Sequence, residues 1–302
     1  MYLFLNLRKF RSKKFLMLFA VAVIVACIIF TQMSSVAVST VSASEGYYVP
    51  VIMYHSILKD SSLQGKYVIS PDQLENDLKY LSENGYSTVT VADLIAYVEN
   101  GTPLPEKPIM LTFDDGYYNN YLYAYPLMKK YGFKMVLSVI GKYSEIFSDT
   151  ADENAYYSHC TWDQLREMEL SGYVEVQNHS YDMHTTDQGR NGTKKNSWES
   201  LENYSSILTG DISKCQNYLI ERAGITPTAF TYPFGAISSE SFDVLKDLGF
   251  KASFSCEEKM NLITRDPKCL FGIYRFLRPT GEASAAYFES TVKIDKYVNI
   301  SE

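Results

Sequence analysis

Short apolar runs and amphipathic runs alternate along this chain from about residue 48 to residue 280, and this alternation limits its fold more than any other feature. The apolar runs are rich in β-branched and aromatic residues, and several end at glycine or a polar cluster, as strands do. They cover residues 49–55, 108–116, 133–141, 173–179, 229–235 and 250–255. Amphipathic runs with helical spacing lie between them. These cover residues 70–85, 91–100, 119–132, 161–172, 197–223 and 238–249.

Strands and helices in alternation predict parallel βα units, arranged either as a barrel or as a doubly wound sheet. Ser70 followed by Pro71 is a typical start of a helix. Cys215 falls on an apolar stripe at helical spacing within residues 197–223, so we interpret it as a buried core thiol. Cys160, Cys256 and Cys269 are not in CxxC spacing, and the sequence leaves their disulfide state open.

The first 46 residues form a leader, and residues 47–302 form the folded domain. Five basic residues precede an uncharged apolar run over residues 15–30, and small residues follow it up to Ala43. This is the layout of an export signal. Three outcomes stay open: cleavage after Ala43, retention as a membrane anchor, or lipidation at Cys27, where IVAC resembles a bacterial lipobox. Each of them places the folded domain outside the cytoplasm.

Net charge narrows the classes of partner. Residues 1–43 hold five of the 28 Lys and Arg residues and no acidic residue, which leaves 23 basic against 35 acidic residues and a net charge of −12 for the remainder. Such a surface repels nucleic acids and anionic polymers. A neutral or cationic substrate is therefore expected.

Candidate catalytic and metal-binding residues lie where the predicted strands end. His55 ends the first strand, Asp114 and Asp115 end the second, His179 ends the fourth, and residues 233–235 end the fifth. In both a parallel barrel and a doubly wound sheet, chemistry lies at the carboxyl ends of the strands. Because unrelated surface residues would scatter, this shared position indicates one site.

The stretch QNHSYDMH places His179 and His184 five positions apart. Neither a helix nor a strand brings two such side chains together, but a loop leaving a strand can. Two imidazoles there form a plausible half of a zinc site, which needs a further ligand and an open position. TFDDG supplies a carboxylate, and a metal bound to Asp115 would leave Asp114 free as a base.

TFDDG, HSYDMH and TYPFG together resemble the successive motifs of the polysaccharide deacetylases with a NodB homology domain, carbohydrate esterase family 4. The resemblance covers about residues 48 to 280. It implies an irregular (β/α)7 barrel that removes N-acetyl or O-acetyl groups from polysaccharides with one divalent metal. It also implies that Asp114 is the general base, that Asp115, His179 and His184 are the metal ligands, and that Phe234 offers a backbone N–H to the oxyanion.

Several positions depart from the common family pattern. Thr231 stands where many members have an arginine that holds the base, which leaves the tuning of Asp114 open. No histidine follows His184, so the usual late general acid is absent, and the corresponding segment, IYRFLRP, has Arg275 and Arg278 instead. The H-x4-H spacing of His179 and His184 replaces the common H-x3-H.

These departures resemble the branch that acts on poly-β-1,6-N-acetylglucosamine. That branch shares H-x4-H and uses a histidine of an early MYH motif as the acid, which here is His55 of VIMYHSI. The fourth histidine, His159, is then interpreted as a structural or rim residue.

The resulting expectation is an extracytoplasmic polysaccharide N-deacetylase that uses zinc, or else cobalt or nickel, on a polymer containing N-acetylglucosamine. The favoured substrate is poly-N-acetylglucosamine and the alternative is peptidoglycan. Two other classes stay open: a non-catalytic carbohydrate-binding barrel and a metal-dependent hydrolase for another bond, such as a phosphoester. No nucleic acid partner is expected, membrane attachment through the leader is possible, and the oligomeric state is open.

Overall fold

The computed structural model describes residues 46–294 and 296, so the expectations for the leader lie outside the described residues. Within them, the main sheet has eight strands, and all its paired strands run parallel. Seven strands follow one another in space: β10 (Ala252–Phe254), β9 (Ala229–Thr231), β8 (Val174–Asn178), β7 (Met135–Val139), β6 (Pro108–Phe113), β2 (Val51–Tyr54) and β12 (Phe276–Leu277). The eighth, β5 (Ser87–Thr88), pairs with the start of β6.

The two edges of this sheet meet through the segment that leads into β12. Phe254 of β10 forms a parallel bridge with Ile273. The N–H of Ile273 donates to the carbonyl of Ser253, and the N–H of Ser255 donates to the carbonyl of Ile273, both at 2.8 Å. Because residues 273–277 therefore pair with β10 first and with β2 afterwards, the sheet curls into an irregular barrel. This confirms the expected irregular (β/α)7 barrel.

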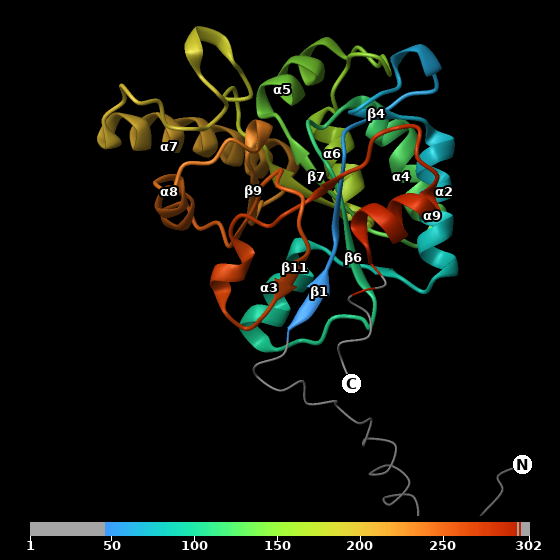
Figure 1. Cartoon of the computed structure of the whole chain (residues 1–302). Coiled ribbons are helices and arrows are strands. Elements are labelled where there is room, and N and C mark those ends of the chain that lie inside the picture. The colour runs from blue at the N-terminus through green and yellow to red at the C-terminus, as the bar shows by residue number, and fades with distance from the viewer. Residues whose placement is uncertain (1–45, 295, 297–302) are drawn as a thin grey trace, which may run out of the picture. The chain divides into compact units, whose positions relative to one another are not determined.

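Helices cover the outside of the curled sheet (Figure 1). They are α2 (Pro71–Glu83), α3 (Val91–Asn100), α4 (Tyr125–Tyr131), α5 (Gly141–Thr150), α6 (Trp162–Leu170), α7 (Leu201–Tyr218), α8 (Ser241–Asp247) and α9 (Ser284–Ala286). Ser70 caps α2 as predicted, because its side chain accepts the N–H of Gln73. All six predicted helical runs contain a helix, whereas α5 and α9 were not predicted.

Shorter elements complete the fold. β1 (Tyr47–Val49) pairs antiparallel with β11 (Asn261–Ile263), and β3 (Ser56–Ile57) pairs with β4 (Val68–Ile69). Single helical turns cover Ser61–Leu63, Asn120–Ala124, Asp187–Gly189, Leu219–Ala223, Pro233–Gly235, Pro267–Leu270 and Tyr287–Val292. No helix among residues 46–294 combines the length and the apolar character that crossing a membrane requires.

Side chains alternate between the two faces of each strand. Ile109, Leu111 and Phe113 of β6 pack outward against the helices, whereas Met110 belongs to the apolar cluster inside the barrel. Cys215 of α7 is fully buried, which confirms its interpretation as a core thiol. All four cysteines of the described chain are free thiols.

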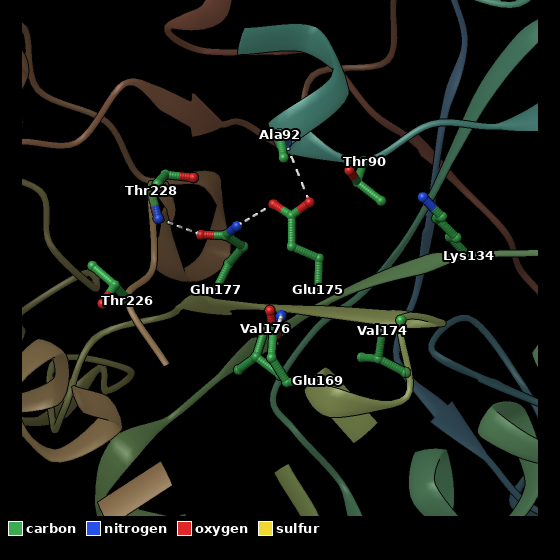
Figure 2. A pocket seen from close by; sticks show the side chains of 11 residues that line it. Thr90, Ala92, Lys134, Glu169, Val174, Glu175, Val176, Gln177, Thr226 and Thr228 are labelled. Carbon is green, nitrogen blue, oxygen red and sulfur yellow. Dashed lines mark hydrogen bonds between the residues drawn. The ribbon is translucent and has the colours of Figure 1, made fainter. Parts of the chain in front are cut away.

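A pocket lies at the amino-terminal end of the barrel. Its volume is about 270 Å³. Figure 2 shows Glu175 and Gln177 pointing into it from β8. Glu175 accepts the N–H of Ala92 at 3.2 Å, and Gln177 accepts the N–H groups of Thr228 and Ala229 at 2.9 and 2.7 Å. These contacts tie β8 to the starts of α3 and β9. The residues discussed next lie at the opposite, carboxyl end of the strands.

Candidate active site

Asp115, His179 and His184 converge at the carboxyl end of the barrel. The Nε2 atoms of His179 and His184 lie 3.5 and 3.4 Å from Oδ1 of Asp115. One ligand atom from each of the three residues lies within 4.8 Å of the other two. The two imidazole rings are 5.0 Å apart and inclined by 64°. The structure thus brings together the three residues that the sequence analysis expected to bind one metal ion.

Left-handed backbone at the end of β6 aims the Asp115 carboxylate. Asp115 has φ of 72° and the following Gly116 has φ of 74°. A non-glycine residue rarely adopts this conformation, and such outliers concentrate at functional sites. A side chain on Gly116 would place its Cβ 2.8 Å from Cγ1 of Val139. Glycine at the end of TFDDG is therefore required both by the turn and by the close approach of β7.

A sharp turn after β8 returns the chain so that His184 faces His179. Ser180 has φ of 74°, and its N–H donates to the side chain of Asn178 at 2.9 Å. The N–H groups of Tyr181 and Asp182 each donate to the carboxylate of Asp211 at 2.8 Å. Asp211 on α7 thus fixes the loop that carries His184. This geometry explains why a spacing of five suits the pair.

Donor chemistry at this cluster fits a divalent cation. Oδ1 of Asp115 is buried and has no hydrogen-bond partner within the described chain. Nδ1 of His179 donates to the carbonyl of Thr231 at 2.7 Å, which leaves Nε2 directed at Asp115. Burial raises the pKa of Asp115, but the neighbouring histidines, His179 first, hold this pKa well below its usual value. A buried carboxylate facing two ring nitrogens is a donor set that zinc, cobalt or nickel accepts.

Asp114 lies beside this cluster and is held by Arg275. Nη1 and Nη2 of Arg275 lie 2.7 and 2.9 Å from the two carboxylate oxygens of Asp114, and Arg275 is fully buried. Burial raises the pKa of Asp114, but the charges of Arg275, His179 and His55, together with the hydrogen bonds from Arg275, outweigh burial, and the net pKa is lowered. Asp114 is therefore ionised and rigidly oriented, as a proton acceptor requires.

Arg275 resolves what the sequence left open about the tuning of Asp114. It reaches Asp114 from the segment before β12, while Thr231 offers a carbonyl to His179 and shares a 2.6 Å hydrogen bond with Ser138. Sequence reasoning placed Arg275 only as a substitute for the late acid. A guanidinium in a buried bidentate ion pair releases no proton near neutral pH. The signal that could have revealed its role is a charged residue inside an otherwise apolar run, FGIYRFL.

Arg278, the other cation of that segment, lies away from the cluster. Its guanidinium pairs with Asp77 of α2 at 2.9 Å, and both side chains are fully buried. It is packed under the helical layer rather than inside the barrel. Arg278 is therefore a structural cation in the described chain.

His55 directly follows β2 and lies beside Asp114. Its Nε2 lies 3.9 Å from Oδ2 of Asp114, and its side chain is 16% exposed. Its ring lies 4.9 Å from that of Tyr67 in an edge-on arrangement. Burial lowers the pKa of His55 in spite of the nearby carboxylates of Asp114 and Asp115. His55 thus faces Asp114 at the carboxyl end of the barrel.

Phe234 adopts φ of 57° in the turn Pro233–Gly235, and its ring lies 4.3 Å from that of His184. The two backbone hydrogen bonds of this turn are donated by Gly235 and Ala236.

His159 is the histidine that the sequence analysis interprets as a structural or rim residue. It is 8% exposed and packs between aromatic rings, and burial lowers its pKa to about 4.

Comparison with protein families places this chain beside a family of known enzymes. The profile described as polysaccharide deacetylase matches residues 101–253, just over half of the 302 residues. This range contains Asp114, Asp115, His179, His184 and Phe234, but not His55 or Arg275.

Curated relatives include the poly-beta-1,6-N-acetyl-D-glucosamine N-deacetylases of Escherichia coli K12 and Staphylococcus aureus MRSA252. Each is 26% identical to this chain, over 226 and 194 residues. The alignments cover 68% and 64% of this chain, but only 33% of the E. coli protein and 62% of the S. aureus protein. Among solved structures, IcaB from Ammonifex degensii superposes with a TM-score of 0.65 at 25% identity, covering 83% of this chain and 97% of that one.

Proposed function

This chain belongs to the polysaccharide deacetylase family, and from this premise we propose that it is a metal-dependent hydrolase that removes N-acetyl groups from poly-β-1,6-N-acetylglucosamine. The observation that carries the proposal is the pair of adjacent aspartates with separate partners. Asp115 faces two histidines, whereas Asp114 is locked by Arg275 and approached by His55. A metal ligand set and a base therefore sit side by side.

A divalent cation held by Asp115, His179 and His184 would supply a Lewis acid for the amide carbonyl and for the attacking water. Asp114 accepts the proton of that water, because Arg275 keeps its carboxylate ionised and fixed. The backbone N–H of Phe234 donates to the developing oxyanion. His55 donates a proton to the departing sugar amine, since an unprotonated amine nitrogen leaves poorly. Arg275 acts through Asp114 and is a positioning residue.

Three observations support poly-N-acetylglucosamine as the polymer. Two relatives that carry this activity in their names align with about two thirds of the chain. The chain after the leader carries a net charge of −12, which favours a neutral polymer over peptidoglycan with its carboxylates. His55 stands where the acid of that branch is expected. We further propose that the leader exports the protein, so that it acts outside the cytoplasm.

Acetate release distinguishes the candidate substrates. The purified protein is treated with a chelator, reloaded with Zn²⁺, Co²⁺ or Ni²⁺, and assayed on poly-N-acetylglucosamine, peptidoglycan, chitin oligomers and acetylated xylan. We expect no acetate from the chelated protein and most from reloaded protein on poly-N-acetylglucosamine. Preference for peptidoglycan would reassign the polymer. Full activity without metal would refute the mechanism, and no acetate from any polymer would favour a non-catalytic carbohydrate-binding barrel.

A further inference from the structure

A wall of aromatic rings begins at the metal ligand Asp115 and runs outward to solvent. Tyr117 follows Asp115 by two residues. The ring of Tyr117 lies 4.7 Å from that of His159. His159 lies 4.5 Å from Tyr143 and 5.6 Å from Phe147, nearly parallel to both. We call these four rings, Tyr117, His159, Tyr143 and Phe147, the aromatic wall, and His159 lies at its centre.

Backbone hydrogen bonds fix the inner part of the aromatic wall to the catalytic turn. The N–H of Tyr118 donates to the carbonyl of Ser158, and the N–H of Cys160 donates to the carbonyl of Gly116, both at 2.8 Å. Tyr117 and His159 thereby form an isolated antiparallel bridge. The wall cannot move relative to Asp115 without breaking these bonds.

The outer part of the wall is fixed to the loop that carries His184. Gly141 and Lys142, at the start of α5, donate their N–H groups to the carbonyls of Ser180 and Tyr181 at 3.0 Å. Tyr143 follows directly, in the first turn of α5 at the carboxyl end of β7. The aromatic wall is thus tied to both segments that supply metal ligands, and Tyr143 has a fixed distance from them.

Tyr143 is the member of the wall that offers a ring to solvent near the site. It is 38% exposed, and His159 covers one of its faces. Because His159 covers one face, a sugar ring would stack on the other face of Tyr143, next to the edge that carries the hydroxyl. A pyranose ring has a face of C–H groups bordered by hydroxyls, so it matches such a surface in both its apolar and its polar part. Because the wall carries no carboxylate or ammonium group, it suits an uncharged sugar.

We propose that Tyr143, supported by His159, binds the pyranose ring next to the sugar whose acetyl group is removed. This inference rests on the proposed function and adds a neighbouring sugar subsite to it. The polymer would lie over α5, and its second ring would stack on Tyr143. Binding at this subsite would make the enzyme prefer oligomers to the monosaccharide.

Chain-length dependence tests the subsite. Acetate release is measured on β-1,6-linked N-acetylglucosamine from monomer to tetramer, with wild type, Tyr143→Leu, Tyr143→Phe and Leu262→Ala. Tyr143→Leu keeps an apolar contact with His159 but has no ring. We expect it to raise KM for the tetramer about tenfold, the order of one lost stacking contact, with kcat and monomer hydrolysis unchanged. Tyr143→Phe should keep KM within about twofold.

Leu262→Ala is the matched control. Leu262 is 43% exposed on β11, at the other end of the barrel from α5 (Figure 1), and its replacement should leave every constant unchanged. An unchanged tetramer KM in Tyr143→Leu would overturn the subsite while leaving the deacetylase intact.

Binding of the tetramer to the metal-loaded protein, measured by titration calorimetry, is an independent test of the subsite. If wild type released no acetate but bound the tetramer more tightly than Tyr143→Leu, the subsite would stand and the proposed activity would fail. Equal binding by both proteins, or none by either, would overturn the subsite.

Discussion

Two adjacent aspartates with opposite surroundings define the chemistry at the scale of single residues. Asp115 turns toward two imidazoles through a left-handed backbone, while Asp114 keeps the direction of the strand and meets Arg275. Like charges this close are costly unless each has its own cation. The structure gives Asp114 a guanidinium and leaves Asp115 with a buried oxygen that no described group satisfies.

Substitution of each aspartate should separate binding of metal from turnover. We expect Asp115→Ala to lose both bound zinc and activity. Asp114→Asn should retain about one zinc per chain and lose about 10²- to 10⁴-fold in kcat, the range of a general base. Metal content by atomic emission and acetate release on the same preparations provide the check. Equal loss of zinc in the two variants would mean that the roles are misassigned.

Arg275 and Arg278 form a matched pair of buried cations, each held by one aspartate. We expect Arg275→Lys to lower kcat/KM by about 10²-fold, because a lysine cannot hold Asp114 at two points. Asp114 must be ionised to accept a proton, and Arg275 lowers its pKa. A weaker hold raises that pKa, so the acidic limb of the pH–rate profile should move to higher pH.

Arg278→Lys serves as the control for loss of a buried ion pair. It weakens the contact with Asp77 of α2 and should lower the melting temperature without moving the acidic limb. If the acidic limb of the pH–rate profile stays at the same pH in Arg275→Lys, Arg275 does not lower the pKa of Asp114.

His55 should act as the proton donor, since the described chain has no histidine after His184 and both late arginines are locked in ion pairs. We expect His55→Ala to fold and to bind zinc, but to lose about 10²-fold or more in kcat. The alkaline limb of its pH–rate profile should flatten, because deprotonation of the acid no longer occurs. A kcat close to that of wild type would leave water as the proton source.

At the scale of elements, the end of β6 determines where both aspartates point. Gly116 has φ of 74° and lies against Val139, so a methyl group there meets both backbone strain and a clash. Gly132 ends α4 with φ of 67°, and a methyl group added to it would have no neighbouring atom within 4 Å. Alanine at either glycine would therefore have a strained left-handed backbone, but only alanine at position 116 would also clash with a neighbour.

Alanine at each glycine separates these two costs. We expect Gly132→Ala to lower the free energy of unfolding by about 1 kcal/mol through backbone strain alone. Gly116→Ala should lose an additional 1–3 kcal/mol, roughly, because Val139 must shift within a packed core. Urea unfolding of both variants measures the difference. Equal losses would show that β7 accommodates the methyl group freely.

At the scale of the whole molecule, the site depends on closure of the barrel. The proposed metal ligands come from the end of β6 and from the end of β8 with the loop that follows it. The proposed base is held from the segment before β12, and His55 directly follows β2. A cation bound to the folded site alone stabilises the entire domain.

Thermal melting measures that coupling. At a free zinc concentration about 100-fold above Kd, the domain should gain about 2.7 kcal/mol, and its melting temperature should rise. Asp115→Ala should show no rise, whereas His159→Phe, which replaces a nearby histidine outside the cluster, should respond like wild type. A zinc-dependent rise in Asp115→Ala would place the metal elsewhere.

The local pattern of the sequence predicted parallel βα units, and the family resemblance then favoured a barrel over a doubly wound sheet. Alternation of apolar runs with runs of helical spacing identified six strands of the barrel and six helices. Strand ends also placed His55, Asp114, Asp115 and His179 on one rim, since parallel strands share a direction. β12 was missed because two residues leave almost no periodic signal, and α5 was missed because it begins at a glycine with no side-chain cap.

Tertiary structure alone decided the pairing of groups that are distant in sequence. Arg275 meets Asp114 across 161 positions only because the last strand closes the barrel beside β2, and Thr231 orients His179 across 52 positions because β9 lies beside β8. His159 has no motif partner in the sequence, yet its backbone forms a bridge with Tyr117, which places it in the aromatic wall beside Asp115. Local spacing reports which face a side chain occupies, whereas partners across the barrel depend on strand order and register, and these are properties of the closed sheet.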